Sequence, residues 1–147
     1  MLDSIKFIDG GITAAKGFTA SGYNCGIKAG RTKNDTALVY SEKLCNASGV
    51  FTRNIVKAES VKYTQQILKN GKAQAAIVNV GYANACTGEQ GAQVAKKMAI
   101  AAANALNINP DDVIICSTSI IGQQVPVKKK EKNIMNLKNG LSKEGHK

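Results

Sequence analysis

Apolar residues change their spacing several times along the chain, and each change predicts a different element. Runs rich in β-forming residues predict strands over residues 36–40 and 49–52, and a glycine-punctuated stretch of small residues predicts another over 19–29. Residues 75–80 and 113–116 are continuous apolar runs. Such runs are typical of strands that are buried on both faces, so we expect both to lie inside the protein.

A first helix is expected where the apolar spacing changes after these early strands. Residues 59–70 predict a helix with Val61, Gln65 and Leu68 on one face, ending at Asn70–Gly71. A period near 3.6 residues separates this segment from a strand, in which side chains alternate every second residue.

The longest helix is expected over residues 89–106. Thr87 and Gln90 stand at the spacing of a capping box, in which each side chain bonds a backbone N–H that lacks a helical partner. Apolar residues at helical spacing form one stripe of this helix: Val94, Met98, Ala101, Ala102 and Ala105. After Pro126 we expect a basic helical tail over 128–147.

The order of these elements defines the expected fold class. Strands and helices follow one another irregularly, which favours an α+β fold with helices packed over a layered sheet. The 147 residues suffice for one core, so residues 1–147 are interpreted as a single domain. An apolar fraction of 44% and a charged fraction of 20% argue against a disordered chain.

Membrane and secretory signals are not evident in the sequence. No run approaches the roughly 18–20 uninterrupted apolar residues that a membrane span requires. Residues 1–6 do not show the basic-then-apolar pattern of a signal peptide. We therefore expect a cytoplasmic protein with no membrane partner.

Metal, disulfide and thiol chemistry find little support. The four cysteines, Cys25, Cys45, Cys86 and Cys116, are widely spaced without a C-x-x-C pair, which argues against a zinc site or a disulfide framework. A catalytic thiol or serine needs a base, and the only histidine is His146, one residue from the end. We expect the cysteines to serve as small buried hydrophobic residues, and we expect no metal or cofactor.

The net charge of +10 raises the question of a nucleic-acid partner. Half of that charge comes from residues 128–147, where seven lysines outnumber two glutamates. No aromatic side chain for base stacking is interleaved with them. A solvated helix face explains the charge better, so we expect no nucleic-acid partner; binding that falls steeply with salt would mark the alternative.

Two segments combine small and polar residues in a way that suits chemistry. Residues 79–88 lead into the capped helix, where glycines allow close backbone approach and the helix N-terminus offers N–H groups to an anion or a polarised oxygen. Ser117, Thr118 and Ser119 are expected to form a polar turn whose dipoles can hold an oxyanion. An ordinary connection and an ordinary turn explain the same residues at least as well, so composition and spacing alone define only an α+β domain.

Those two segments resemble signature segments of the ornithine acetyltransferase (glutamate N-acetyltransferase) family. Matching segments occur in family order along almost the whole chain: Gly11–Phe18, Ala20–Lys28, Asp35–Val39, Gly49–Thr52 with Asn54, Val78–Gly88, and Ser117–Thr118 with Ile120–Gly122. The run Ala83–Gly88 is the most specific of them. The chain is thus similar to the N-terminal stretch of the family's α chain.

The resemblance implies a fold and a reaction. Family members form an α-β-β-α sandwich, which this chain would contain only in part. A precursor cuts itself before a threonine into α and β chains, and that threonine then serves as the nucleophile. It carries acetyl from N-acetylornithine to glutamate in arginine biosynthesis, and some members also accept acetyl-CoA. The implied partner is a β chain with an N-terminal threonine, in a heterotetramer of two α and two β chains.

The resemblance assigns one role to residues of this chain. In the family a Thr-Gly pair lines the oxyanion hole; here the threonine is Thr118, and Ser119 occupies the glycine position. A backbone N–H survives this exchange, but a conformation with φ > 0 strains a serine. Thr118 and Ser119 are therefore the expected catalytic residues, and no substrate-binding residue is assigned.

Further departures from the family leave two interpretations open. Val80 and Tyr82 replace a serine and an asparagine of the asparagine-rich motif, and the family's cleavage junction would lie beyond Lys147. We expect the chain alone to be inactive. It is either the α-side portion of a working acetyltransferase or a truncated or divergent non-catalytic fragment, which predicts an exposed apolar sheet face and self-association.

Overall fold

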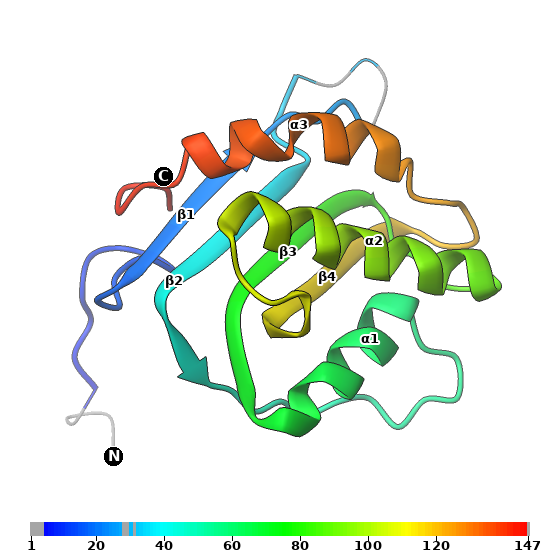
Figure 1. The fold of residues 1–147 in the computed structure, drawn as a ribbon, viewed down its shortest axis with the longest axis horizontal. Helices are drawn as coiled ribbons and strands as arrows, with labels where there is room; N and C mark the ends of the chain where they lie inside the picture. Colours follow the sequence, from blue (N-terminus) through cyan, green and yellow to red (C-terminus); the bar gives the residue numbers. More distant parts are fainter. Residues whose placement is uncertain (1–4, 28–29, 31, 147) are drawn as a thin grey trace.

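The structure, a computed structural model, describes residues 5–27, 30 and 32–146. Its elements are β1 (Phe18–Tyr23), β2 (Thr36–Asn46), α1 (Glu59–Ile67) with a 3₁₀ turn (Leu68–Asn70), β3 (Lys72–Tyr82), α2 (Gly88–Leu106), a second 3₁₀ turn (Pro110–Asp112), β4 (Val113–Ile120) and α3 (Val127–Asn139) (Figure 1). This mixture of helices and strands confirms the α+β class.

One mixed sheet organises the molecule, with its strands in the order β1-β2-β3-β4. β2 runs antiparallel to both β1 and β3, whereas β3 and β4 are parallel. A parallel pair requires a crossover connection, and α2 supplies it. The C-terminal ends of β3 and β4 therefore lie side by side at the same end of the sheet.

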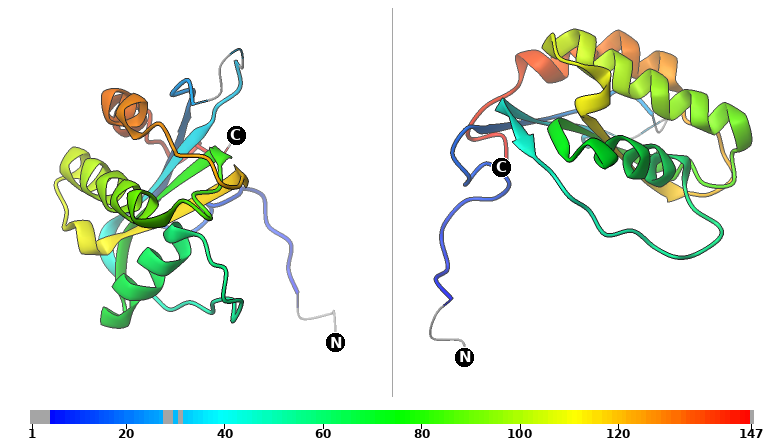
Figure 2. Two further views of the ribbon diagram at one scale, coloured as in Figure 1. Left: turned by 90° about the vertical axis from the view of Figure 1, so that its right-hand side faces the viewer. Right: turned by 60° about the horizontal axis from the view of Figure 1, so that its bottom comes forward.

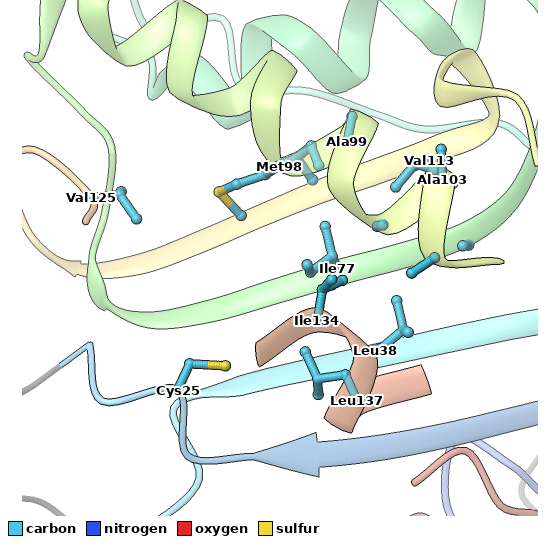
Figure 3. Close-up of a cluster of buried hydrophobic side chains, with 14 of the residues drawn as sticks. Cys25, Leu38, Ile77, Met98, Ala99, Ala103, Val113, Val125, Ile134 and Leu137 are labelled. Atoms are coloured by element: carbon cyan, nitrogen blue, oxygen red, sulfur yellow. The ribbon is translucent and has the colours of Figure 1, made fainter. Parts of the chain in front are cut away.

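Helices α2 and α3 cover one face of this sheet and enclose the core (Figure 2). Side chains from every layer meet there: Leu38 of β2, Ile77 of β3, Met98 of α2 and Leu137 of α3 are each at most 1% exposed (Figure 3). The buried stripe of α2 includes residues that its sequence did not predict, whereas the predicted Ala101 is only half-buried. The stripe is rich in alanines that let the helix approach the sheet closely. It consists of Gly91, Val94, Ala95, Met98, Ala99, Ala102, Ala103 and Ala105.

The opposite face of the sheet carries no helix in the described part of the chain (Figure 2). Two apolar rows cross it, one of Val39, Ala76 and Ile114 and one of Ala37, Val78 and Cys116. The side chains of both rows are half-buried or exposed. The expectation that the strands at 75–80 and 113–116 are buried on both faces is therefore wrong for this open face, which we define by these two rows together with Val80 and Thr118. An apolar open face fits an incomplete sandwich.

Helix α1 lies against the outer edge of β4. The Thr64 hydroxyl accepts the Ile115 N–H and donates to the Ile115 carbonyl, both at 3.1 Å, so it satisfies backbone groups that an edge strand leaves unpaired. This contact turns Ser60, Thr64 and Ile67 inward. The predicted face of Val61, Gln65 and Leu68 is thus wrong, although the helix ends where expected, with Gly71 at φ +71°.

Two expectations about strands are corrected. β1 ends at Tyr23, so the strand expected over 19–29 is shorter; residues 28 and 29 lie outside the described ranges. Residues 49–52 form no strand because the chain leaves the sheet after Asn46 to reach α1, and β2 is already paired on both sides.

The helical tail is also shorter than expected over 128–147. α3 ends at Asn139, and Ser142 then exchanges two backbone hydrogen bonds with Ala20, each 3.0 Å. The tail therefore pairs with the edge strand β1; Lys147 lies outside the described residues. Within the described ranges, no helix combines the length and the apolar character required to cross a bilayer.

Candidate active site

The two segments that stand out in the sequence meet where β3 and β4 end. The parallel register places Asn79 beside Ser117, Val80 beside Thr118 and Gly81 beside Ser119. The crossover through α2 brings together residues that are nearly forty positions apart in sequence. One expectation is corrected: residues 117–119 belong to β4 and are not a turn, because the strand pairing continues to Ile120.

Thr118 lies on the open face of the sheet. Side chains alternate along a strand, so Ser117 faces the helices and Thr118 faces away from them. Thr118 is exposed, and its neighbour Val80 is 44% exposed. The Thr118 hydroxyl thus lies at the end of an edge strand, on a surface that the described part of the chain does not cover.

Ser119 adopts the backbone conformation that favours glycine. Its φ is +108°, and its register partner Gly81 has φ +131°. Glycine accepts such values without steric cost, whereas an L-residue with a Cβ is strained by about 1–3 kcal/mol. The serine at the position where the resemblance implies glycine therefore sits in a strained backbone at the end of β4.

The loop between β3 and α2 is tied to the end of β4 by backbone hydrogen bonds. The Ala83 N–H donates to the Ile120 carbonyl at 2.7 Å, and the Gly122 N–H donates to the Ala85 carbonyl at 2.8 Å. Asn84 and Cys86 within this loop have φ of +52° and +56°. The loop and the strand end thus form one connected unit.

Asn84 anchors that loop from inside. Its side chain is fully buried; the Nδ2 group donates to the Gly91 carbonyl at 2.9 Å, and Oδ1 accepts from the Thr87 hydroxyl at 2.8 Å. The backbone carbonyl of Asn84 accepts the Glu59 N–H at 2.8 Å, and this bond links the loop to α1. The capping box predicted for Thr87 and Gln90 is wrong, since the Thr87 hydroxyl bonds Asn84 and makes no side-chain cap.

Asn79 and Asp35 are residues at this end whose roles the sequence did not indicate. The Asn79 amide is fully buried, donating through Nδ2 to the Tyr82 carbonyl at 2.8 Å and accepting from the Ser117 hydroxyl at 2.7 Å. The Asp35 carboxylate is also buried and accepts the Cys25 and Ile27 N–H groups at 2.8 and 2.7 Å. The only signal for Asn79 was an amide within an apolar run.

Thiol and imidazole groups do not build a second catalytic arrangement at this end. Cys86 and Cys116 are exposed, so the expectation of buried cysteines holds for Cys25 but not for these two. Desolvation raises the pKa of the Cys116 thiol above its ordinary value, which disfavours a thiolate. His146 bonds Thr13, with 2.6 Å between Nδ1 and Oγ1, beside the tail that pairs with β1. Among the described residues, no group of three His, Cys, Asp or Glu side chains is placed to hold a metal.

Known structures identify the class of protein to which this fold belongs. The crystal structure of an ornithine acetyltransferase from Mycobacterium tuberculosis, complexed with ornithine, matches 92% of this chain and 74% of that chain, with a TM-score of 0.88 and 39% identity. A crystal structure of arginine biosynthesis bifunctional protein ArgJ from Bacillus halodurans matches 93% of this chain and 71% of that chain, with a TM-score of 0.85 and 36% identity. The fold is that of the ornithine acetyltransferases.

The sequence places the chain within one family. Residues 19–147 match the model of the ArgJ family, and the chain belongs to that family. Arginine biosynthesis bifunctional protein ArgJ from Caldanaerobacter subterraneus is 50% identical over 96% of this chain, and the one from Gloeobacter violaceus is 46% identical over 84%. The chain spans about a third of the length of these curated relatives, 34% and 30% respectively.

The packing around Asn84 predicts an unusual response at Gly91. Alanine in place of a helical glycine ordinarily stabilises by about 1 kcal/mol. A Cβ at Gly91 would instead collide with the Thr87 hydroxyl and lie 2.7 Å from Asn84 Oδ1. Breaking that buried hydrogen bond and overpacking the site each cost about 1–3 kcal/mol, so Gly91→Ala is expected to lower the free energy of unfolding by about 2 kcal/mol in urea denaturation. The same change in a Thr87→Gly background, which removes both the hydroxyl and the Thr87 Cβ that would lie 2.7 Å away, is expected to cost less; an equal cost would contradict the collision.

The strain at Ser119 predicts that glycine stabilises this position. Ser119→Gly releases about 1–3 kcal/mol of backbone strain and adds about 0.5–1 kcal/mol of chain entropy to the unfolded state, so a net gain of about 1 kcal/mol is expected. Thr118→Gly, at a neighbouring position without positive φ, is expected to destabilise instead. Thermal and urea unfolding of both variants measure this difference, and a loss of stability in Ser119→Gly would refute the strain.

Proposed function

We propose that this chain is the N-terminal portion of the α side of a glutamate N-acetyltransferase, which moves acetyl from N-acetylornithine to glutamate. The nucleophilic threonine lies outside this chain, on the partner β chain of a heterotetramer. Membership of the ArgJ family and the likeness to an ornithine acetyltransferase support the reaction class. The chain spans about a third of the length of the curated relatives, so the activity is proposed for the assembled enzyme and not for this chain alone.

The position of Thr118 is the observation that carries this proposal. Acetyl transfer passes through a tetrahedral intermediate whose oxygen becomes negatively charged, and donors that are already oriented stabilise it. The Thr118 hydroxyl is exposed at the end of β4, and the Ser119 backbone N–H follows it in the same strand end. Both are held by a unit of short hydrogen bonds before any substrate arrives.

The open face gives the nucleophile a place from which to approach. Two sheets that pack face to face bury the apolar side chains of both inner faces. The rows through Ala76 and Val78 are apolar and uncovered in the described chain, and Thr118 is at one end of them. A second sheet from the rest of the enzyme, packed on these rows, brings its threonine to the Thr118 end.

The proposed reaction is a ping-pong transfer in two steps, with acetyl-threonine as the intermediate. The threonine hydroxyl attacks the acetyl carbonyl of N-acetylornithine, its own amine takes the proton, and ornithine leaves with that proton while acetyl remains on the threonine. The glutamate amine attacks the acetyl-threonine in the reverse sense. Thr118 and Ser119 stabilise the oxyanion in both halves. Acetyl-CoA as a second acetyl donor follows from the family resemblance alone.

A hybrid enzyme tests this proposal. In the hybrid, this chain replaces the matching third of the Caldanaerobacter subterraneus relative, to which it is 50% identical. We expect it to transfer acetyl from N-acetylornithine to glutamate. Thr118→Ala is expected to lower kcat by about 10²–10³-fold with a smaller change in KM, because the lost donor acts in the transition state.

Thr19→Ala is the matched control. Thr19 lies in β1, and its register partners across the sheet are Tyr40, Ala75 and Val113. Val113 is at the beginning of β4, at the opposite end of that strand from Thr118. Loss of the Thr19 hydroxyl is therefore expected to leave kcat unchanged. A soluble, assembled hybrid that shows no turnover would reject the proposed activity of this chain. A Thr118→Ala variant as active as the parent would reject the oxyanion role.

A non-catalytic fragment is the second candidate, and the strained Ser119 favours it. Val80 adds an apolar side chain beside Thr118, where a polar one would support a charged intermediate. A hybrid that is inactive as it stands and becomes active with Ser119→Gly would identify a weakened copy of the family site.

A further inference from the structure

We propose that Asn79 is a positioning residue, whose buried amide fixes the end of β4 so that Thr118 and Ser119 present their donors to the reacting acetyl group. This inference rests on the proposed acetyl transfer. It assigns a role to a side chain that touches no substrate, since Asn79 is on the helix-covered side of the sheet.

Packing alone does not account for an asparagine at this position. Asn79 continues the covered face of β3 after Ala75 and Ile77, and it is 0% exposed. An amide in such surroundings has a large desolvation cost unless both of its ends are hydrogen-bonded. Both ends of this amide are bonded, with short distances of 2.7 and 2.8 Å. A leucine would fill a similar volume without that requirement, so the two hydrogen bonds are the distinctive property of the residue.

The first bond acts across the strands on the residue that precedes Thr118. The Ser117 hydroxyl donates to Asn79 Oδ1, which fixes the Ser117 side chain on the covered face. Successive side chains of a strand point to opposite faces, so a fixed Ser117 holds Thr118 toward the open face. The bond therefore sets the direction of the Thr118 hydroxyl without contacting it.

The second bond acts along β3 on the backbone opposite Ser119. Asn79 Nδ2 donates to the Tyr82 carbonyl, across Gly81 with φ +131°. Ser119, the register partner of Gly81, is in its strained conformation with φ +108°. Strained conformations persist only where neighbouring contacts determine them, and the amide of Asn79 supplies such contacts to both strands.

Backbone contacts on the other side of Asn79 keep the amide in place. The Val80 N–H donates to the Asp35 carbonyl at 2.9 Å. Asn79 also pairs in register with Thr36 of β2 and with Ser117 of β4, so it is interior to the sheet. Its amide therefore couples a rigid interior strand to the edge strand that carries the donors.

Kinetics of the hybrid enzyme separate positioning from general stability. Asn79→Leu keeps the volume and removes both bonds, and Ser117→Ala removes only the cross-strand bond. Because a misplacement of about 1 Å can lower a rate by about 10²-fold, kcat is expected to fall about 100-fold in Asn79→Leu and about 10-fold in Ser117→Ala, with KM nearly unchanged. The double variant is expected to be no worse than Asn79→Leu alone, since the two residues share one bond.

Ser21→Ala is the matched control. Ser21 is also a buried serine, and its hydroxyl donates to the Leu137 carbonyl at 2.6 Å, beneath α3 and away from the end of β4. We expect its kcat to equal that of the parent hybrid. The positioning role is overturned if kcat falls in Thr118→Ala but not in Asn79→Leu or Ser117→Ala. The proposed function stays intact in that case. If Thr118→Ala also has no effect, the oxyanion role of Thr118 fails as well, whereas a parent hybrid without turnover is the separate result that rejects the proposed function.

Hydrogen exchange of this chain on its own gives a second readout that needs no turnover. Loss of the Asn79 bonds is expected to speed amide exchange over residues 118–122 and to leave the centre of α2 unchanged. Ser117→Ala, which removes a single half-buried hydroxyl, provides the same readout if Asn79→Leu fails to fold. Exchange that rises equally throughout the chain, or not at all near Thr118, contradicts the inference.

Discussion

The parallel pairing of β3 with β4 is the constraint on which the rest of this structure depends. It places Asn79 beside Ser117 and Val80 beside Thr118, so the asparagine-containing loop and the hydroxyl-bearing strand end meet at one edge of the sheet. Helix α2 forms the crossover connection that allows β3 and β4 to pair in parallel. Its alanines let it pack close enough to the sheet to bury Ile77 and Val113. The register thus organises the site and the core together, because the residues that alternate with the core residues face the open side.

The two faces of the sheet have different roles. Below α2 and α3 the side chains are tightly packed, and the polar groups that enter this region, such as Asn79 and Asn84, are hydrogen-bonded at both ends of their amides. The other face is apolar and uncovered in the described chain, with Thr118 at its end. A covered face that fixes the geometry of the strand ends and an open apolar face fit the proposal that a second layer packs here and shares the site.

Much of the fold follows from local patterns in the sequence, and the errors have physical causes. The apolar runs at 75–80 and 113–116 and the long helical period after Thr87 identify β3, β4 and α2 correctly. The buried face of α1 is missed because a single hydroxyl, that of Thr64, bonds the edge of β4, and no hydrophobic period records such a contact. The capping box fails for a related reason, since the Thr87 hydroxyl bonds a buried side chain in place of the helix backbone.

The site itself is predictable only through family resemblance. That resemblance marks Thr118 and Ser119, but the positive φ of Ser119 and the bridging amide of Asn79 depend on strand register, which a single sequence does not specify. The central claim is that the open face becomes covered in the complete enzyme. Cys116, exposed on that face two residues before Thr118, reports on it directly through its rate of alkylation, resolved by mass spectrometry. We expect Cys116 to be alkylated in this chain alone at a pH above the raised pKa of its thiol, and to be strongly protected at the same pH in the assembled hybrid enzyme. Equal rates in the two states would contradict it.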